Sequence, residues 1–338
     1  MVQSLGGALQ KKMDVITTIG GKSPARPDAC ARGCVADFSI EPAAPFRLDL
    51  TAWVLRRRPD NIIDRWDGGT YRRVLVIDGQ PVGMAISQAG PPERPIIHVS
   101  ISGDMLNQGA KVLATSILTR MLGTDIDLGG FYRLAAQDRQ LGALAHQFHG
   151  VRPVRFPTLF EALVNAITCQ QLSLLVGIRL LDRLTESYGP LFIERNKTAR
   201  AFPGPEDLAG LDSKSLQPLG FSRNKARAII ELASAIVEKR LDLCELENLD
   251  NETAAARLRQ LYGVGRWTAE YVLLRGLGRL DVFPADDVGA RNNLRRWLGL
   301  VRPLDHDGVN GAIAEWREYG GLIYFHLLLK RIMEAGFL

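Results

Sequence analysis

The strand pattern of this chain ends near residue 130, and this change constrains the fold more than any other feature of the sequence. Apolar and polar residues alternate over 71–77, 82–86 and 97–101, with the period of two that is typical of β-strands. Asp78-Gly79 separates the first two runs and predicts a tight hairpin turn. Beyond residue 131 the apolar spacing is helical. We therefore expect an α+β N-terminal domain, an antiparallel sheet with helices, followed by an all-α region.

Three segments follow from this pattern. Residues 1–40 include Pro24 and Pro27 in a stretch without sustained helical or strand spacing, so we predict a flexible tail there. Residues 41–130 make up the α+β domain. Residues 131–338 make up the helical region, which is large enough for two lobes with a cleft between them.

The charge and hydropathy of the chain restrict its partners and its location. A formal net charge of +5 permits a polyanionic partner without requiring one. No apolar run approaches the roughly 20 residues of a membrane span, and residues 1–12 lack the apolar core of a signal peptide. We expect no membrane partner and a cytoplasmic, nucleoid-associated location, or a nuclear one in a eukaryote.

The cysteines argue against a disulfide framework or a metal cluster. Cys30, Cys34, Cys169 and Cys244 are widely scattered, which is not the pattern of a disulfide-stapled domain. Cys30 and Cys34 are the only close pair, and with no neighbouring His or second pair we expect free thiols rather than a metal site. The set cannot supply four clustered ligands, so we expect no iron–sulfur cluster.

Residues 261–265 are the most informative local motif. Gly263 and Gly265 lie two apart between helical patterns, which permits a tight turn that brings backbone close to a partner. The next helix offers free N–H groups to an anion, and Arg266 adds a positive charge. A DNA phosphate fits such a hairpin and would be bound without sequence readout. The glycine pair alone is explained at least as well by a plain helix-to-helix turn. A monovalent cation bridging hairpin and phosphate is a further, weaker prediction.

The helix after the hairpin leads to a pair of carboxylates. Trp267 and Tyr271 fall on one face of that helix, a pattern that usually marks a core. The chain then reaches Asp286 and Asp287 directly before a helix that begins near Val288. One of the two is expected to cap that helix, but two carboxylates exceed what a cap requires.

Two segments around the hairpin resemble the helix-hairpin-helix DNA glycosylase superfamily, most closely the bacterial DNA-3-methyladenine glycosylase II type. They read Gly-Val-Gly-Arg-Trp-Thr-Ala-Glu-Tyr over 263–271 and Asp-Val-Phe-Pro-Ala-Asp-Asp over 281–287. Residues 159–173 resemble the first pocket helix of this family, and residues 46–73 resemble its N-terminal domain. The likeness extends from about residue 42 to the end of the chain.

The resemblance implies a catalytic residue and a reaction. The family's catalytic aspartate lies 20 residues after the tryptophan of the hairpin helix, which designates Asp287 and leaves Asp286 as the helix cap or a hydrogen-bonding neighbour. Asp287 would stabilise the positive charge that develops on the sugar, or orient the attacking water. Bifunctional relatives carry a lysine where this chain has Trp267, and tryptophan forms no Schiff base. The resemblance thus implies a monofunctional glycosylase, without lyase activity, that flips and removes alkylated bases of the 3-methyladenine and 7-methylguanine type in base excision repair.

The resemblance also implies the residues that surround the base and the DNA. Aromatic faces attract a cationic base by about 0.5–2 kcal/mol each. Tyr319 stands where the family usually has tryptophan, and the neighbouring Trp316 is an alternative. For Gln170 and Gln171, ordinary helix-end hydrogen bonding explains their presence equally well. The implied base pocket comprises Trp267, Tyr271, Tyr319, Gln170 and Trp53, and the implied DNA contacts are Gly263, Gly265, Arg266, the wedge Gln171 or Leu172, Arg223, Lys225 and Arg291.

Two other functions stay open at this point. A glycosylase for oxidised or deaminated bases is disfavoured by the missing lysine and by the several aromatic residues of the implied pocket. A non-catalytic DNA-binding protein on the same scaffold would not need Asp287 at its distance from Trp267. The expected partner is double-stranded DNA with damaged bases, bound by a monomer that requires no cofactor.

Overall fold

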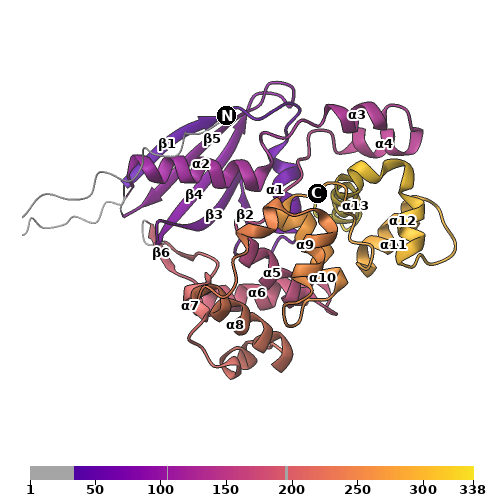
Figure 1. Ribbon diagram of the computed structural model, residues 1–338. Coiled ribbons are helices and arrows are strands. Elements are labelled where there is room, and N and C mark those ends of the chain that lie inside the picture. The colour runs from indigo at the N-terminus through magenta and orange to yellow at the C-terminus, as the bar shows by residue number, and fades with distance from the viewer. Residues whose placement is uncertain (1–33, 105, 195–196) are drawn as a thin grey trace, which may run out of the picture. The chain divides into compact units, whose positions relative to one another are not determined.

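The computed structural model describes residues 34–104, 106–194 and 197–338. It contains a five-stranded antiparallel sheet with the strand order β1-β5-β4-β3-β2, shown in Figure 1. The hairpin turn predicted at Asp78-Gly79 joins β3 to β4. The strands are β1 (Cys34–Ile40), β2 (Arg65–Asp67), β3 (Thr70–Ile77), β4 (Gln80–Ala89) and β5 (Ile96–Gly103).

Strand β1 corrects the predicted extent of the flexible tail. Residues 34–40 pair with β5 over their whole length, from Cys34 opposite Gly103 to Ile40 opposite Ile97. The prediction of a tail over 1–40 was therefore wrong for these seven residues, whose short alternation was masked by the prolines before them. The rest of the predicted tail, residues 1–33 with Cys30, lies outside the described residues. Among the described residues, Cys34, Cys169 and Cys244 are free thiols.

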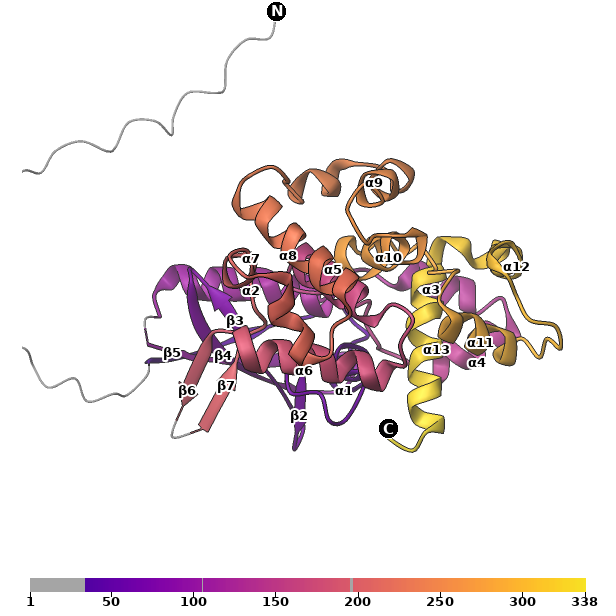
Figure 2. The same cartoon turned by 90° about the horizontal axis from the view of Figure 1, so that it is seen from below.

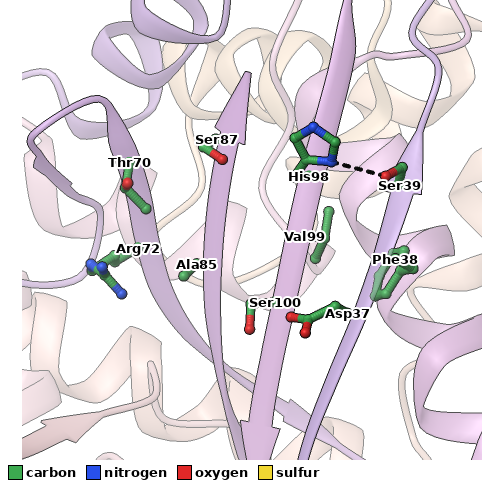
Figure 3. Close-up of a pocket in the computed structure, with 10 residues that line it drawn as sticks. All are labelled: Asp37, Phe38, Ser39, Thr70, Arg72, Ala85, Ser87, His98, Val99 and Ser100. Carbon is green, nitrogen blue, oxygen red and sulfur yellow. Dashed lines mark hydrogen bonds between the residues drawn. The ribbon is translucent and has the colours of Figure 1, made fainter. Parts of the chain in front are cut away.

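The two faces of the sheet differ because successive strand residues point to opposite sides. One face is apolar, and its Ile86 and Val99 are fully buried in the same core as residues of α2, which crosses the sheet in Figure 1. The other face is polar and forms an open depression of about 480 Å³. Figure 3 shows its hydroxyl, carboxylate and basic side chains, including a 3.0 Å hydrogen bond between the Ser39 hydroxyl and His98 Nδ1.

The rest of the chain is predominantly helical, as the loss of the strand pattern predicted. Short 3₁₀ segments occupy Ser213–Leu219, Cys244–Asn248 and Ala314–Tyr319, and a π-helical turn, η3, occupies Leu273–Leu277. In the described part of the chain, no helix is long and apolar enough to cross a membrane. The α-helices are α1 (Leu48–Arg56), α2 (Gln108–Leu122), α3 (Gly129–Ala135), α4 (Arg139–Gln147), α5 (Leu159–Cys169), α6 (Leu174–Tyr188), α7 (Pro205–Leu208), α8 (Arg223–Val237), α9 (Asn251–Leu258), α10 (Arg266–Val272), α11 (Val288–Trp297), α12 (His306–Ala312) and α13 (Gly320–Glu334).

Two hydrophobic cores divide the helices into lobes. One core is built by the segment from Phe156 to Leu277, which includes α5 to α10. The other joins α3, α4 and α11 to α13 with α1, α2 and the sheet. It therefore combines buried residues from 46–154 with buried residues from 274–329. Figures 1 and 2 show α3 and α4 beside α11 to α13. The two lobes are as predicted. The domain boundary expected at residue 130 does not coincide with a boundary between the cores, because one core contains residues from both sides of it.

A small hairpin departs from the predicted all-α character of this region. Strands β6 (Leu191–Glu194) and β7 (Lys197–Arg200) pair with each other and approach the polar face of the sheet. Phe192 reaches Gly83 so closely that a Cβ atom at Gly83 would lie 2.4 Å from its ring. The expectation that no strands follow residue 131 was wrong here, because strands of four residues are too short to show a clear period.

Candidate active site

Asp287 lies where the loop after η3 enters α11. It is the N-cap of that helix, and its Oδ1 atom accepts a 2.8 Å hydrogen bond from the Ala290 N–H. The indole Nε1 of Trp267 donates to Oδ2 over 3.3 Å. The side chain is half-buried. The structure therefore brings together the two residues whose spacing drew attention to them, with one carboxylate oxygen anchored by a helix and the other by an aromatic ring.

Asp286 is not the cap that the sequence suggested. The Asp287 N–H donates to the Pro284 carbonyl over 3.0 Å, and this turn places Asp287 rather than Asp286 at the start of α11. Asp286 instead accepts hydrogen bonds from Nε and Nη2 of Arg266. This guanidinium lowers the pKa of the Asp286 carboxyl. Arg266, expected to face a phosphate, is thus paired with a carboxylate but remains half-exposed.

Glu270 and His306 hold the loop that carries Asp287. Glu270, on α10, accepts a hydrogen bond from the Ala285 N–H at 3.0 Å through Oε2. Its other oxygen lies 3.1 Å from His306 Nε2. Burial opposes the charged imidazole, but hydrogen bonds to Asp307 and Glu270 prevail and raise the pKa of His306. Neither residue was singled out from the sequence, because they come together from α10 and α12.

Three aromatic side chains, from α10 and α13, lie near Asp287. The ring centroids of Trp267 and Tyr271 are 5.5 Å apart with their planes inclined by 32°. Tyr271 is almost fully buried, whereas Trp267 is half-buried and accessible to a ligand. Tyr324, from α13, was missed in the sequence. Burial first, and then the nearby Asp287 carboxylate and Tyr271, raise the pKa of Tyr324.

Arg57 reaches this site from the N-terminal domain. Its Nη1 donates to the Tyr271 hydroxyl oxygen at 3.1 Å, and its Nη2 donates to Asn165 Oδ1 at 2.8 Å. The residue follows α1 with a φ of 58°, in the left-handed region. The sequence shows only three consecutive arginines, 56–58, after an apolar helix. No local signal distinguishes the buried Arg57 from a surface charge.

Trp53 and Tyr319 contact other partners than the Trp267–Tyr271 pair. Trp53 is half-buried, and the Arg56 guanidinium carbon lies 4.6 Å from the centre of its ring. Tyr319 precedes α13 and packs edge-on against Phe131 of α3, with centroids 5.7 Å apart. Within the described residues, no ring contact joins either side chain to Trp267. Their roles in the base pocket stay predictions.

The end of α5 is tied to the hairpin. The Gln170 side-chain amide donates to the Gly263 carbonyl at 2.7 Å and to the Thr268 hydroxyl at 2.8 Å. These bonds are the structural role that the sequence left open, and the place of Gln170 in the base pocket stays a prediction. Gln171 is exposed in the left-handed region with a φ of 54°, and Leu172 is exposed beside it. The wedge assigned to these two residues stays a prediction.

Lys225 is used inside the protein. Its ammonium donates to the Thr168 carbonyl at 2.9 Å and the Gln170 carbonyl at 2.7 Å, and so satisfies the free carbonyls at the end of α5. Burial lowers the pKa of this ammonium. These two bonds give Lys225 a structural role, and the phosphate contact assigned to it stays a prediction. Arg223, at the start of α8, is exposed, and Arg291, on α11, is half-buried.

The hairpin has the geometry that its two glycines predicted. It links α9 to α10, and Gly263 has a φ of 79°. A Cβ atom at Gly263 would lie 2.8 Å from that of Ala228, whereas one at Gly265 would meet open space. Glycine is therefore required at the first position for conformation and close packing. Over the described ranges, no group of three His, Cys, Asp or Glu side chains is arranged to hold a metal ion.

Comparison with known proteins places the hairpin and Asp287 within a matched family model. The family model described as HhH-GPD superfamily base excision DNA repair protein matches residues 164–316. The chain is 30% identical over 203 residues to the DNA-3-methyladenine glycosylase of Bacillus subtilis, covering 60% of this chain and 67% of that protein. It is 31% identical over 180 residues to DNA-3-methyladenine glycosylase 1 of Schizosaccharomyces pombe, covering 53% of this chain and 74% of that protein.

A solved structure extends the similarity to the N-terminal domain. The 3-methyladenine DNA-glycosylase from Archaeoglobus fulgidus aligns with a TM-score of 0.74 and 28% identity, covering 86% of this chain and 97% of that one. Sequence matches span less of the relatives: 66% and 67% of two Bacillus subtilis proteins and 50% of a Mycobacterium tuberculosis protein.

Proposed function

This chain belongs to the HhH-GPD superfamily of base excision DNA repair proteins, and we propose that it is a monofunctional DNA glycosylase for alkylated bases. The family predicted from the hairpin and the carboxylate pair is confirmed. The observation that carries the proposal is the Trp267–Asp287 contact, because it places an aromatic face and a carboxylate at one point. The names of its relatives support 3-methyladenine-type substrates.

Base removal follows from this arrangement. A flipped base stacks on the accessible face of Trp267, which brings its sugar to Asp287. The bond between C1′ and the base nitrogen breaks, its electron pair stays with the base, and an alkylated cationic base leaves as a neutral molecule. The Asp287 carboxylate stabilises the positive charge left on the sugar. Water then adds to C1′ and releases a proton, and no cofactor is consumed.

DNA binding is proposed to use the hairpin and the loop after α5. The N–H groups around Gly265 and the half-exposed Arg266 face one phosphate, and the exposed Arg223 lies at the start of α8. Gln171 or Leu172 fills the gap that the flipped base leaves. The proposed partner is double-stranded DNA bound by a monomer. A monovalent cation at the hairpin is a separate proposal, tested by the dependence of affinity on Na⁺ and K⁺ at constant ionic strength.

Strand cleavage is not expected from this site. A lyase step needs an amine that attacks C1′, and the position beside Asp287 holds the Trp267 indole, whose Nε1 donates to the carboxylate. Arg57 and Arg275 are nearby cations, but guanidinium groups do not form Schiff bases at neutral pH because they stay protonated.

The test is the release of free bases from methylated duplex DNA, separated by chromatography, together with the integrity of the strand. Free 3-methyladenine and 7-methylguanine with an intact abasic strand are the expected products. Release of oxidised or deaminated bases alone would assign the other glycosylase class. Binding without release would indicate a DNA-binding protein, and nicking without added base or lyase would refute monofunctional chemistry.

A further inference from the structure

Tyr271 is the more deeply buried ring of the Trp267–Tyr271 pair, and a buried arginine donates a hydrogen bond to it. Arg57 donates to the Tyr271 hydroxyl oxygen at 3.1 Å. Because a guanidinium has no acceptor atom, the phenol oxygen must accept, and its own hydrogen is free to donate elsewhere. Arg275, in η3, is fully buried with its guanidinium carbon 5.7 Å from the centre of the Tyr271 ring. Two cations thus lie against the same tyrosine.

These donors are incompletely satisfied. The buried Nε of Arg57 and the buried Nε and Nη1 of Arg275 have no hydrogen-bond partner. Arg275 makes a single side-chain hydrogen bond, from Nη2 to the Val54 carbonyl at 3.0 Å, and its guanidinium lies over the rings of Phe156 and Phe325 as well as Tyr271. In the described part of the chain, neither guanidinium pairs with a carboxylate; Arg57 relies on the neutral Asn165 and Tyr271. Unpaired buried cations are costly, and an acceptor on a bound base would offset part of that cost.

The backbone at Arg57 gives a second, independent indication. Its φ of 58° is rare for a residue with a side chain. Such conformations cost about 1–3 kcal/mol and persist where surrounding contacts require them, often at functional sites. Here the turn ends α1 and directs the Arg57 guanidinium toward α5 and α10 instead of solvent.

We propose that Arg57 is a specificity-determining residue that favours bases with a carbonyl oxygen at the inner end of the pocket over bases with an amino group there. The inference rests on the proposed function. When C1′ lies at Asp287, the edge of a purine remote from its glycosidic bond points inward, and that edge carries the C6 substituent. The Tyr271 O–H, oriented by Arg57, donates to the oxygen of a 6-oxopurine. The amino group of a 6-aminopurine meets a donor instead.

Methylated duplex DNA supplies a matched pair of probes. In DNA, 3-methylguanine and 3-methyladenine carry the methyl group at the same position and both are cationic. At C6 the first has a carbonyl and the second an amino group; the first also has an amino group at C2, which is the same in every variant compared. The measurement is the ratio of their initial release rates. Arg57→Met is expected to lower the ratio of 3-methylguanine to 3-methyladenine about tenfold, since one hydrogen bond from a charge-supported donor is lost. An unchanged ratio would overturn the proposal.

Arg58→Met is the matched control. Arg58 is the next residue and forms a 2.8 Å ion pair with Asp60, and both side chains are partly exposed. Its loss removes the same charge but should leave the ratio unchanged. An equal fall in the ratio would mean that net charge, not the contact with Tyr271, governs selectivity, and would refute the assignment.

Tyr271→Phe keeps the test decisive if Arg57→Met does not fold. The ring and its packing stay, only the hydroxyl is lost, and the same fall in the ratio is expected. A double variant should fall no further than either single one. If the wild-type protein releases neither base, the proposed function itself fails; if it releases both and all variants keep the wild-type ratio, only this inference fails.

Discussion

The Asp287 side chain combines a structural and a chemical task in one carboxylate. Its Oδ1 caps α11 and its Oδ2 receives the Trp267 indole N–H. Because the cap fixes one oxygen, the orientation of the other is set before any ligand arrives. This preorganisation is what stabilises charge in a transition state without reorganisation of the site.

Asp287→Asn separates the two tasks. Asparagine is as good an N-cap as aspartate, so the free energy of unfolding should change by less than about 1 kcal/mol. Excision should fall by at least about 10²-fold, since the negative charge is lost, while affinity for damaged DNA persists. Initial rates of base release, urea denaturation and fluorescence anisotropy measure the three quantities. Near-normal turnover would show that Asp287 is not the catalytic residue.

His306 should make the stability of the Asp287 loop depend on pH. Its pKa is raised in the folded protein, so its ion pair with Glu270 stabilises below about pH 6.5, the ordinary histidine pKa. That contribution is lost as the pH rises through the raised value. His306→Gln should therefore destabilise more at pH 5.5 than at pH 8.5, by less than about 1 kcal/mol for a partly exposed pair. Urea denaturation at both pH values tests this, and a larger effect at pH 8.5 contradicts it.

Among individual residues, the sequence predicted those that lie close together in a recognisable motif. The resemblance to the family linked Trp267 with Asp287, 20 residues later, and the structure brings the indole Nε1 within 3.3 Å of the carboxylate. Arg57 and Tyr271 are separated by 214 positions, and Tyr324 arrives on α13. Contacts over such distances depend on tertiary packing, which no periodicity records.

The hairpin shows how an element constrains its own residues. Gly263→Ala would place a Cβ atom 2.8 Å from that of Ala228 and hold an L-residue at a φ of 79°. We expect a loss of more than about 1 kcal/mol in the free energy of unfolding and weaker binding to duplex DNA.

Gly265→Ala is the control for stability, because nothing lies within 4 Å of its Cβ position. Its change in unfolding free energy should stay within about 0.5 kcal/mol of wild type. Urea denaturation compares the two variants, and fluorescence anisotropy measures the affinity of Gly263→Ala. Equal stability of both variants would show that the hairpin tolerates a side chain at position 263.

The sequence predicted the long helices and strands correctly. Helices such as α8 and strands such as β4 extend over enough residues to establish a period. Strand β1 and the β6–β7 hairpin do not, and they are ordered by pairing with β5 and by Phe192 packing onto Gly83. The exact start of α11 was also uncertain: Asp286 was expected to be its cap or a hydrogen-bonding neighbour, and the structure shows Asp287 as the cap and Asp286 bonded to Arg266.

On the scale of the whole molecule, a buried ion pair joins the sheet to the lobe that contains α5 to α10. Arg73, on β3, and Glu161, on α5, are both nearly inaccessible to solvent and 2.5 Å apart. Arg73 also pairs with Asp64, which accepts from Tyr71. Burial opposes the charged form of Glu161 and raises its pKa. The charges of this network are therefore tolerated in the interior only because each one has an oppositely charged partner.

Glu161→Gln should therefore destabilise the protein by about 3–5 kcal/mol, because it leaves part of the Arg73 charge buried without its partner. Glu247→Gln, which breaks the exposed pair with Arg120, should cost less than about 1 kcal/mol. Urea denaturation followed by fluorescence compares them. A loss below 1 kcal/mol for Glu161→Gln would show that the lobes are not joined by this network.

The tie between α5 and the hairpin has a consequence for how DNA is searched. Gln170 binds the hairpin, and Lys225 binds the carbonyls on either side of Cys169. Under the proposed function, the loop bearing Gln171 therefore keeps a fixed position relative to the hairpin that binds the phosphates as the protein moves along the duplex. Every base pair then meets the same loop geometry, and a base whose unstacking costs little free energy leaves the helix most readily. Discrimination then begins in the mechanics of the DNA, before any base enters the pocket.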